Sequence, residues 1–327
     1  MKVFLNALGF LTIFRISEKS YIDEKIFHKI LYYFPLVGLI IGLLCSFVFW
    51  IAGFIFPGIL CIIIAVLAEV FLSGGMHLDG LADTSDGIFS GKKNKEKITE
   101  IMKKSDIGAF GVISLIFLFV FKIAIVYIIF IILSRSTESI ELLKNTDITG
   151  NTGSSIQSYF SSLPSFDVIK LINFTAFFSM MPLLSRWTIN FHFARFSGYA
   201  SSGSLTGIFI GNGNKKAFFA TTVYLSVFYI LSNAAAGYFL KENFLFNNFS
   251  SIIINTSLSV SDSSLLFVLI PVLKSLIIIF MIALFTETAG KFLIKRIGRL
   301  SGDAIGAVVE IAEVIYLFFV YILIFIF

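Results

Sequence analysis

The chain has 327 residues, of which 57% are hydrophobic and only 14% are charged. A soluble domain carries about 25% charged residues, so this composition excludes an ordinary water-soluble fold. The net charge is +5, but the basic residues lie in short segments between apolar stretches, where membrane orientation places them, and a nucleic-acid partner is not indicated. We predict one all-α polytopic domain over residues 1–327, a helical bundle embedded in the lipid bilayer.

The chain begins with an apolar segment, residues 1–16, that no small-residue cleavage site follows, which predicts an N-terminal interfacial helix. Apolar stretches of about the length of a membrane span then recur and predict about seven transmembrane helices. They lie at about 32–55, 57–73, 108–134, 170–193, 217–240, 264–290 and 304–327. Pro57 and Gly58 separate the first two by a tight turn. The two cysteines lie inside apolar stretches and indicate neither a disulfide nor a zinc site.

The charges of the connecting segments predict how the helices are oriented. Residues 92–104 carry six lysines against two glutamates, and residues 291–299 carry four bases and no acid, which places both in the cytoplasm. Acids outnumber bases in the segments at about 135–169 and 241–263, which we predict to be external loops. Seven spans satisfy these assignments if the N-terminus is inside. We therefore predict a multi-pass protein of the cytoplasmic (cell inner) membrane.

The most informative segment, His77 to Gly87, lies between the second span and the lysine-rich segment. If it is helical, Asp79, Asp83 and Asp86 share one face, because they stand at positions i, i+4 and i+7. Like charges this close destabilise a helix unless a cation offsets them. Carboxylates at this spacing suit Mg²⁺ or Ca²⁺. Mg²⁺ typically combines one or two carboxylates with substrate phosphates and water, so the spacing favours a metal site for phosphoryl chemistry. The alternative is an acidic helix start, which the helix dipole favours, at the membrane surface.

A second acidic pair begins the last span, where Asp303 and Glu310 are seven residues apart and share a helix face. Because carboxylates inside a membrane usually face the bundle interior or a water-filled cavity, we expect both to do so, at an end that the topology places on the same side as His77 to Gly87. We also consider His77 as catalytic or, alternatively, as structural. The candidate substrate-binding residues are cations within apolar spans and small residues at helix starts, which suit phosphate. They are Gly75, Ser105, Gly108, Lys122, Arg186 and Arg195.

Three motifs together resemble the cobalamin 5′-phosphate synthase family (adenosylcobinamide-GDP ribazoletransferase). They are Gly74 to Gly87, Ile107 to Gly111, and Ser301 to Asp303 followed by Gly306, Ala307 and Glu310. The resemblance implies an Mg²⁺-dependent enzyme that joins adenosylcobinamide-GDP to α-ribazole or α-ribazole 5′-phosphate. The products would be adenosylcobalamin or its 5′-phosphate, and GMP. For this reaction the resemblance implies that Asp303 and Glu310 act as further metal ligands or as the general base. The chain departs from the family pattern at residues 298–303 and at Asp106, where the family commonly has a basic residue.

Two other functions compete with this interpretation. A CDP-alcohol phosphotransferase also has clustered aspartates, but its pattern requires an arginine that the stretch Asp79 to Asp83 lacks. A secondary transporter would place its acids near the bilayer midplane, whereas most of these acids lie near one membrane surface. The sequence leaves open whether the protein is a monomer or a homo-oligomer.

Overall fold

The computed structural model describes residues 1–17, 21, 23–145, 168–200, 205–209, 214–240 and 260–326. These residues are organised in helices, and the strand-like pairing among them is an isolated bridge between Ala200 and Leu300. The predicted all-α fold is therefore confirmed. The predicted external loops fall mainly on residues 146–167 and 241–259, which lie outside the described residues.

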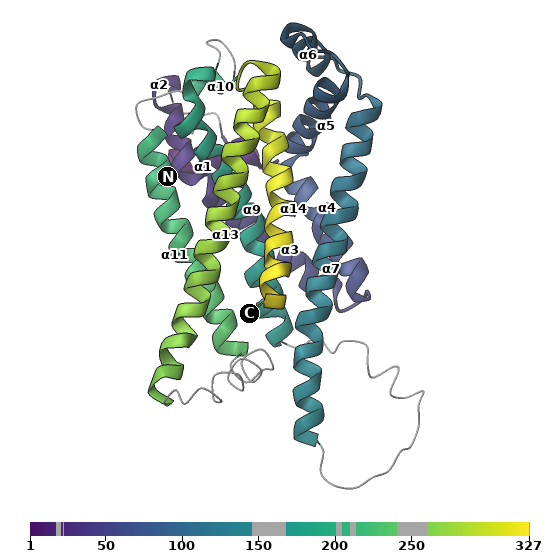
Figure 1. The fold of residues 1–327 in the computed structure, drawn as a ribbon, viewed down its shortest axis with the longest axis vertical. Coiled ribbons are helices and arrows are strands. Elements are labelled where there is room, and N and C mark those ends of the chain that lie inside the picture. The colour runs from purple at the N-terminus through teal and green to yellow at the C-terminus, as the bar shows by residue number, and fades with distance from the viewer. Residues whose placement is uncertain are drawn as a thin grey trace.

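Each of the seven predicted spans corresponds to a helix, and the long helices run along the long axis of the molecule (Figure 1). These are α3 (Phe34–Ala52), α4 (Gly58–Ser73), α7 (Ala109–Asn145), α9 (Val168–Phe196), α11 (Asn214–Leu240), α13 (Val260–Ile297) and α14 (Gly302–Ile326). The shorter helices are α1 (Lys2–Leu11), α2 (Glu24–Phe27), η2 (His28–Tyr33), α5 (Met76–Phe89), α6 (Lys95–Met102), η3 (Ser197–Tyr199) and α10 (Leu205–Ile208). The predicted N-terminal helix is α1.

The predicted number of seven membrane spans is not confirmed in full. Within the described residues, four helices are long and apolar enough to cross a bilayer, and the bent pair α4 and α5 adds a fifth. Helix α9 falls outside this group, and its middle is buried on every side and carries polar residues such as Ser185, Arg186 and Asn190. Because it contacts other helices rather than lipid, α9 does not need an apolar surface.

Two glycines allow α3 to pack closely against the central helix α9. A Cβ atom at Gly38 would lie 2.2 Å from the carbonyl oxygen of Pro182, and one at Gly42 would lie 2.5 Å from the Cα of Ser179. Small residues four positions apart let two membrane helices approach at backbone distance. This contact holds α9 in the core of the bundle.

The outer helices present apolar side chains to their surroundings. On α7, Ile116, Phe117 and Phe121 are each more than half exposed, and on α13 so are Leu276 and Phe280. A continuous exposed apolar surface of this kind is unfavourable in water but is the expected surface in a bilayer. The pattern supports the multi-pass membrane fold.

One end of the bundle gathers α5, α6 and α10 with the junction between α13 and α14, at the top of Figure 1. At this junction the Leu300 N–H donates to the carbonyl of Tyr199 at 2.9 Å, and the Thr206 hydroxyl donates to the carbonyl of Leu300 at 3.2 Å. The Lys95 side chain of α6 packs against Gly298. The two lysine- and arginine-rich segments that the charge pattern assigned to the same side thus meet at one end of the molecule.

Candidate functional site

A sharp bend between α4 and α5 orients the acidic segment. The two helices meet at 90° across Gly74 and Gly75, whose φ angles are 68° and 71°. This left-handed conformation is readily adopted by glycine and disfavoured for residues with a Cβ atom. Gly75, which we predicted to bind substrate, therefore has a clear conformational role: it ends the turn and starts α5.

Helix α5 carries the three predicted metal ligands, and it is helical over Met76–Phe89 as the spacing required. Burial, together with the nearby carboxylates of Asp79, Asp303 and Asp86, raises the pKa of Asp83 to about 6. The predicted proximity of the α5 aspartates to the start of α14 is thus found in the structure. Negative charge is concentrated where α5 and α14 meet.

Asp86 differs from the other two aspartates because protein groups already bind it. Its carboxylate accepts hydrogen bonds from the N–H groups of Gly108 at 2.7 Å and Gly111 at 2.9 Å, just before and within the first turn of α7. A Cβ atom at either glycine would lie within 2.5 Å of the Asp86 carboxylate, so both positions must be glycine for this contact. The backbone donors that we expected to bind phosphate, including Gly108, are occupied by Asp86.

The carboxylates of Asp79 and Asp83 have no hydrogen bond or ion pair with any part of the chain that the structure describes. Among the same residues, no three His, Cys, Asp or Glu side chains are grouped closely enough to hold a metal ion by themselves. Mg²⁺ usually binds through one or two carboxylates and completes its shell with phosphate oxygens and water. The free Asp79 and Asp83 pair fits a site of this open kind and does not form a closed protein cage.

The start of α14 packs directly on α5 through two glycines. A Cβ atom at Gly80 would lie 2.7 Å from the backbone oxygen of Asp303, and one at Gly306 would lie 3.2 Å from the Cα of His77. The Ser301 hydroxyl caps α14 by accepting a hydrogen bond from the Ala304 N–H at 3.1 Å. This crossing explains how residues more than 200 positions apart come together.

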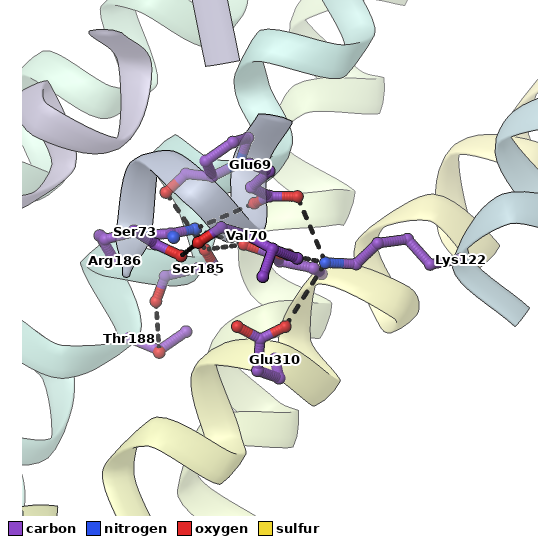
Figure 2. A network of polar contacts seen from close by, with 10 residues as sticks. Glu69, Val70, Ser73, Lys122, Ser185, Arg186, Thr188 and Glu310 are labelled. Atoms are coloured by element: carbon purple, nitrogen blue, oxygen red, sulfur yellow. Dashed lines mark hydrogen bonds and ion pairs between the residues drawn. The ribbon is translucent and has the colours of Figure 1, made fainter. Parts of the chain in front are cut away.

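Deeper in the bundle lies a second set of charges, which we call the buried ion cluster. It consists of Glu69 from α4, Lys122 from α7, Arg186 from α9, and Glu310 and Glu313 from α14. The Lys122 Nζ lies 3.3 Å from Glu69 Oε2 and 3.4 Å from Glu310 Oε2, and it also contacts Glu313. Figure 2 shows the Lys122 side chain directed at the Glu69 and Glu310 carboxylates. The cluster joins four helices.

Arg186 completes the buried ion cluster from the central helix. Its Nη1 lies 3.4 Å from Glu69 Oε1 and contacts Glu313, and the Ser185 hydroxyl donates to Glu313 at 2.8 Å. Every charged side chain in the cluster is at most 6% exposed. The three carboxylates thus share two cations in a water-poor environment, where removing one partner is costly.

The cluster changes the interpretation of three predicted residues. Lys122 and Arg186, which we expected to bind substrate phosphate, are bound to carboxylates inside the bundle. Glu310 shares a helix face with Asp303 but lies two turns further along α14, about 10 Å at 1.5 Å per residue. Sharing a face does not place two residues at the same depth. Glu310 therefore belongs to the buried ion cluster, whereas Asp303 lies with Asp79 and Asp83 in a group of acids that we call the acidic surface.

Glu69 and Glu313 belong to the site, although we did not predict either of them as a site residue. Both are acids within apolar stretches. Because carboxylates inside a membrane usually pair with other groups, their positions in the sequence are a signal that could have identified them. Which cation each one binds depends on contacts between four helices. The spacing of residues within a single helix does not predict that pairing.

His77 lies between the acidic surface and the buried ion cluster. His77 is 5% exposed, its Nδ1 has no hydrogen-bond partner among the residues that the structure describes, and the charges of Arg186 and Glu313 act on it. Its backbone contacts Gly306, between the depths of Asp303 and Glu310 on α14. The buried, unsatisfied nitrogen is available to a group that enters the site.

The remaining two predicted substrate-binding residues lie at the surface. Ser105 is exposed in the segment between α6 and α7. The Arg195 side chain is 60% exposed and forms an ion pair with Glu287 of α13, with Nε 3.2 Å from Oε2. The ion pair assigns Arg195 to the contact between α9 and α13.

Comparisons with known proteins agree with these motifs. The profile of the cobalamin-5-phosphate synthase family matches residues 3–142 and 149–321. A protein of Fusobacterium nucleatum named adenosylcobinamide-GDP ribazoletransferase is 29% identical over 325 residues, which cover 97% of this chain and 96% of the relative. One of the same name from Clostridioides difficile is 28% identical over 327 residues, the whole of both chains.

A third relative of that name, from Alkaliphilus metalliredigens, is 44% identical over 124 residues, which cover 38% of this chain and 48% of the relative. No solved structure matches the chain significantly. The match to the family profile extends over nearly all the helices described above, including both layers of the site. The chain therefore belongs to the cobalamin-5-phosphate synthase family.

Proposed function

We propose that this chain is an adenosylcobinamide-GDP ribazoletransferase, the activity in the names of its relatives in F. nucleatum and C. difficile. The observation that carries the proposal is the pair Asp79 and Asp83, which has no recorded polar partner among the described residues and lies beside Asp303 where α5 and α14 cross. Free carboxylates next to a third acid suit a cation-bridged diphosphate substrate.

In the proposed reaction, the ribose 3′-hydroxyl of α-ribazole, or of its 5′-phosphate, attacks the cobinamide-side phosphorus of adenosylcobinamide-GDP. A new P–O bond forms, the bond between the two phosphates breaks, and GMP leaves with the electron pair. The hydroxyl proton passes to a base. The products are adenosylcobalamin, or its 5′-phosphate, and GMP.

The residues have distinct proposed roles in this step. Asp79 and Asp83 would hold Mg²⁺, which neutralises charge on the diphosphate when bound. Asp303 is our candidate for the base, because it is on α14 beside these aspartates and a carboxylate there can receive the proton. Asp86 holds the start of α7 against α5, and we assign it a positioning role rather than direct metal binding.

The buried ion cluster, which lies deeper in the bundle, stabilises the position of α14 in this arrangement. It ties α14 to α4, α7 and α9, so it fixes the helix that carries Asp303. We propose that the site faces the cytoplasm, because the lysine-rich helix α6 lies at the same end of the bundle as α5. The protein would then act in the cytoplasmic membrane with its N-terminus inside.

The test is product formation by the purified protein in lipid nanodiscs. Adenosylcobinamide-GDP is supplied with Mg²⁺ and either α-ribazole or α-ribazole 5′-phosphate, and GMP and the corrinoid product are identified by mass spectrometry. We expect stoichiometric GMP and joined corrinoid with at least one acceptor, and neither product when the acceptor is omitted. Absence of both products from the folded protein with both acceptors would contradict the proposal.

A further inference from the structure

Two arginines at the junction of α13 and α14 border the acidic surface and retain free hydrogen-bond donors. The Nη2 of Arg296 donates to the carbonyl of Ile88 at 2.8 Å, at the end of α5. Its Nε and the Nε of Arg299 are buried, and neither has a hydrogen-bond partner within the described residues. Buried guanidinium nitrogens without partners are unusual, because an unmet donor in the interior costs free energy.

The backbone around Arg299 is fixed rather than loose. Leu300 is hydrogen-bonded on both sides, to Tyr199 and Thr206, and Ser301 caps the start of α14. The charge of Arg299 acts on the Asp303 carboxyl, although the structure records no ion pair between them among the described residues. The backbone that carries Arg299 is therefore fixed, and its guanidinium acts on Asp303 without forming an ion pair with it among the described residues.

We infer that Arg299, supported by Arg296, forms a phosphate-binding subsite for the guanosine-side phosphate of the substrate. This inference rests on the proposed function and adds the group that receives the leaving GMP. Negative charge builds on the leaving phosphate as the bond between the phosphates breaks, and an arginine fork binds phosphate oxygens through two parallel hydrogen bonds. Lys122 and Arg186, the two cations deeper in the bundle, are already bound to carboxylates in the buried ion cluster.

Arg296 supports the subsite from the end of α13. Its contact with Ile88 fixes the end of α5, and its Nε remains unpaired. A phosphate bound by Asp79 and Asp83 through a cation would then have the Arg299 guanidinium, whose charge acts on the neighbouring Asp303, as a protein donor. This combination of charges suits a diphosphate, whose oxygens must be shared between a cation and protein donors.

The test measures binding of GDP with Mg²⁺ to the purified full chain, without turnover. We expect Arg299→Ala to weaken GDP binding on the order of 10-fold or more, as loss of a charge-assisted contact does. Arg299→Lys should restore binding in part, because lysine keeps the charge but not the fork. The matched control is Lys93→Ala, which removes an equal charge from an exposed position at the same end of the bundle.

The possible outcomes separate this inference from the proposed function. If GDP binding depends on Arg299 but the wild type releases no GMP from adenosylcobinamide-GDP, the subsite stands and the proposed function fails. If the wild type releases GMP while Arg299→Ala changes neither GDP affinity nor the KM for the nucleotide substrate, the subsite is overturned and the function stands. No GDP binding by the wild type, or equal weakening by Lys93→Ala, would also overturn the subsite. Thermal unfolding of each variant shows that it is folded.

Discussion

Asp83 and Asp86 both lie on the acidic side of α5 but have different surroundings. Asp86 binds two backbone N–H groups of the Gly108–Gly111 segment, whereas Asp83 has no recorded polar partner among the described residues and lies among carboxylates. The spacing of the aspartates in the sequence predicted their common face correctly. It did not distinguish the aspartate that holds α7 in place from the aspartates that remain free.

This difference predicts separate effects of two matched substitutions. Asp83→Asn removes a charge from the substrate side, so GMP release should fall by about 100-fold or more while the melting temperature is kept. Asp86→Asn weakens two hydrogen bonds to the backbone and should destabilise the protein by roughly 1–3 kcal/mol. Activity assays and thermal unfolding in the same detergent measure both effects. Full activity of Asp83→Asn, or an unchanged melting temperature for Asp86→Asn, would contradict these assignments.

Lys122 makes the complementary prediction for the buried ion cluster. Lys122→Met leaves three buried carboxylates with one cation, so it should destabilise the fold by roughly 3–5 kcal/mol. Adding Glu313→Gln removes one of the three negative charges that then share Arg186 and should recover part of that stability. The exposed Lys103→Met is the control for loss of a lysine. If Lys122→Met melts at the wild-type temperature, the cluster does not contribute to stability as we describe.

At the scale of helices, the sequence predicted positions better than ends and contacts. Apolar stretches located all seven long helices, because membrane helices must be apolar where they face lipid. The third predicted span, at about 108–134, agrees with the apolar part of α7, Ala109–Leu133, but the helix itself continues to Asn145, where the polar composition no longer marks a span. The close crossing of α5 and α14 was predicted only as a shared side, because Gly80 and Gly306 gain their meaning from the partner helix.

The crossing of α5 and α14 can be tested with one methyl group. Gly80→Ala places a Cβ atom 2.7 Å from the Asp303 backbone oxygen and should move α14 away from the acids of α5. We expect GMP release to fall by more than 10-fold, since small misplacements of catalytic groups are costly. Gly302→Ala adds the same methyl group in open space and is the control. Equal activity of the two variants would show that the close crossing is not required.

At the scale of the whole molecule, the charge pattern predicted which segments share an end. Helix α6 and the end of α13 do lie together, as Figure 1 and the contact of Lys95 with Gly298 show. The side of the membrane that this end faces remains a prediction from the positive-inside rule. The turn between α3 and α4 should lie on the opposite side of the membrane, because the length of α4 separates it from the end of the bundle that carries α5.

Cysteine labelling in intact cells tests this orientation. The native Cys45 and Cys61 are buried, so reactivity should come from an introduced thiol. A reagent that does not cross the membrane should label Ile55→Cys in the turn between α3 and α4, and should label Lys93→Cys only after the cells are opened. The reverse pattern would place the site outside the cell.

The account depends most on the claim that Asp79 and Asp83 bind a diphosphate through a divalent cation. The most direct measurement is the rate of GMP release from adenosylcobinamide-GDP with α-ribazole, or its 5′-phosphate, as Mg²⁺ is titrated, for the wild type and for Asp83→Asn. We predict no release by the wild type after chelation, recovery when Mg²⁺ is added, and a much weaker response to Mg²⁺ in Asp83→Asn. The same Mg²⁺ response in both proteins, or undiminished release by the wild type after chelation, would contradict the account.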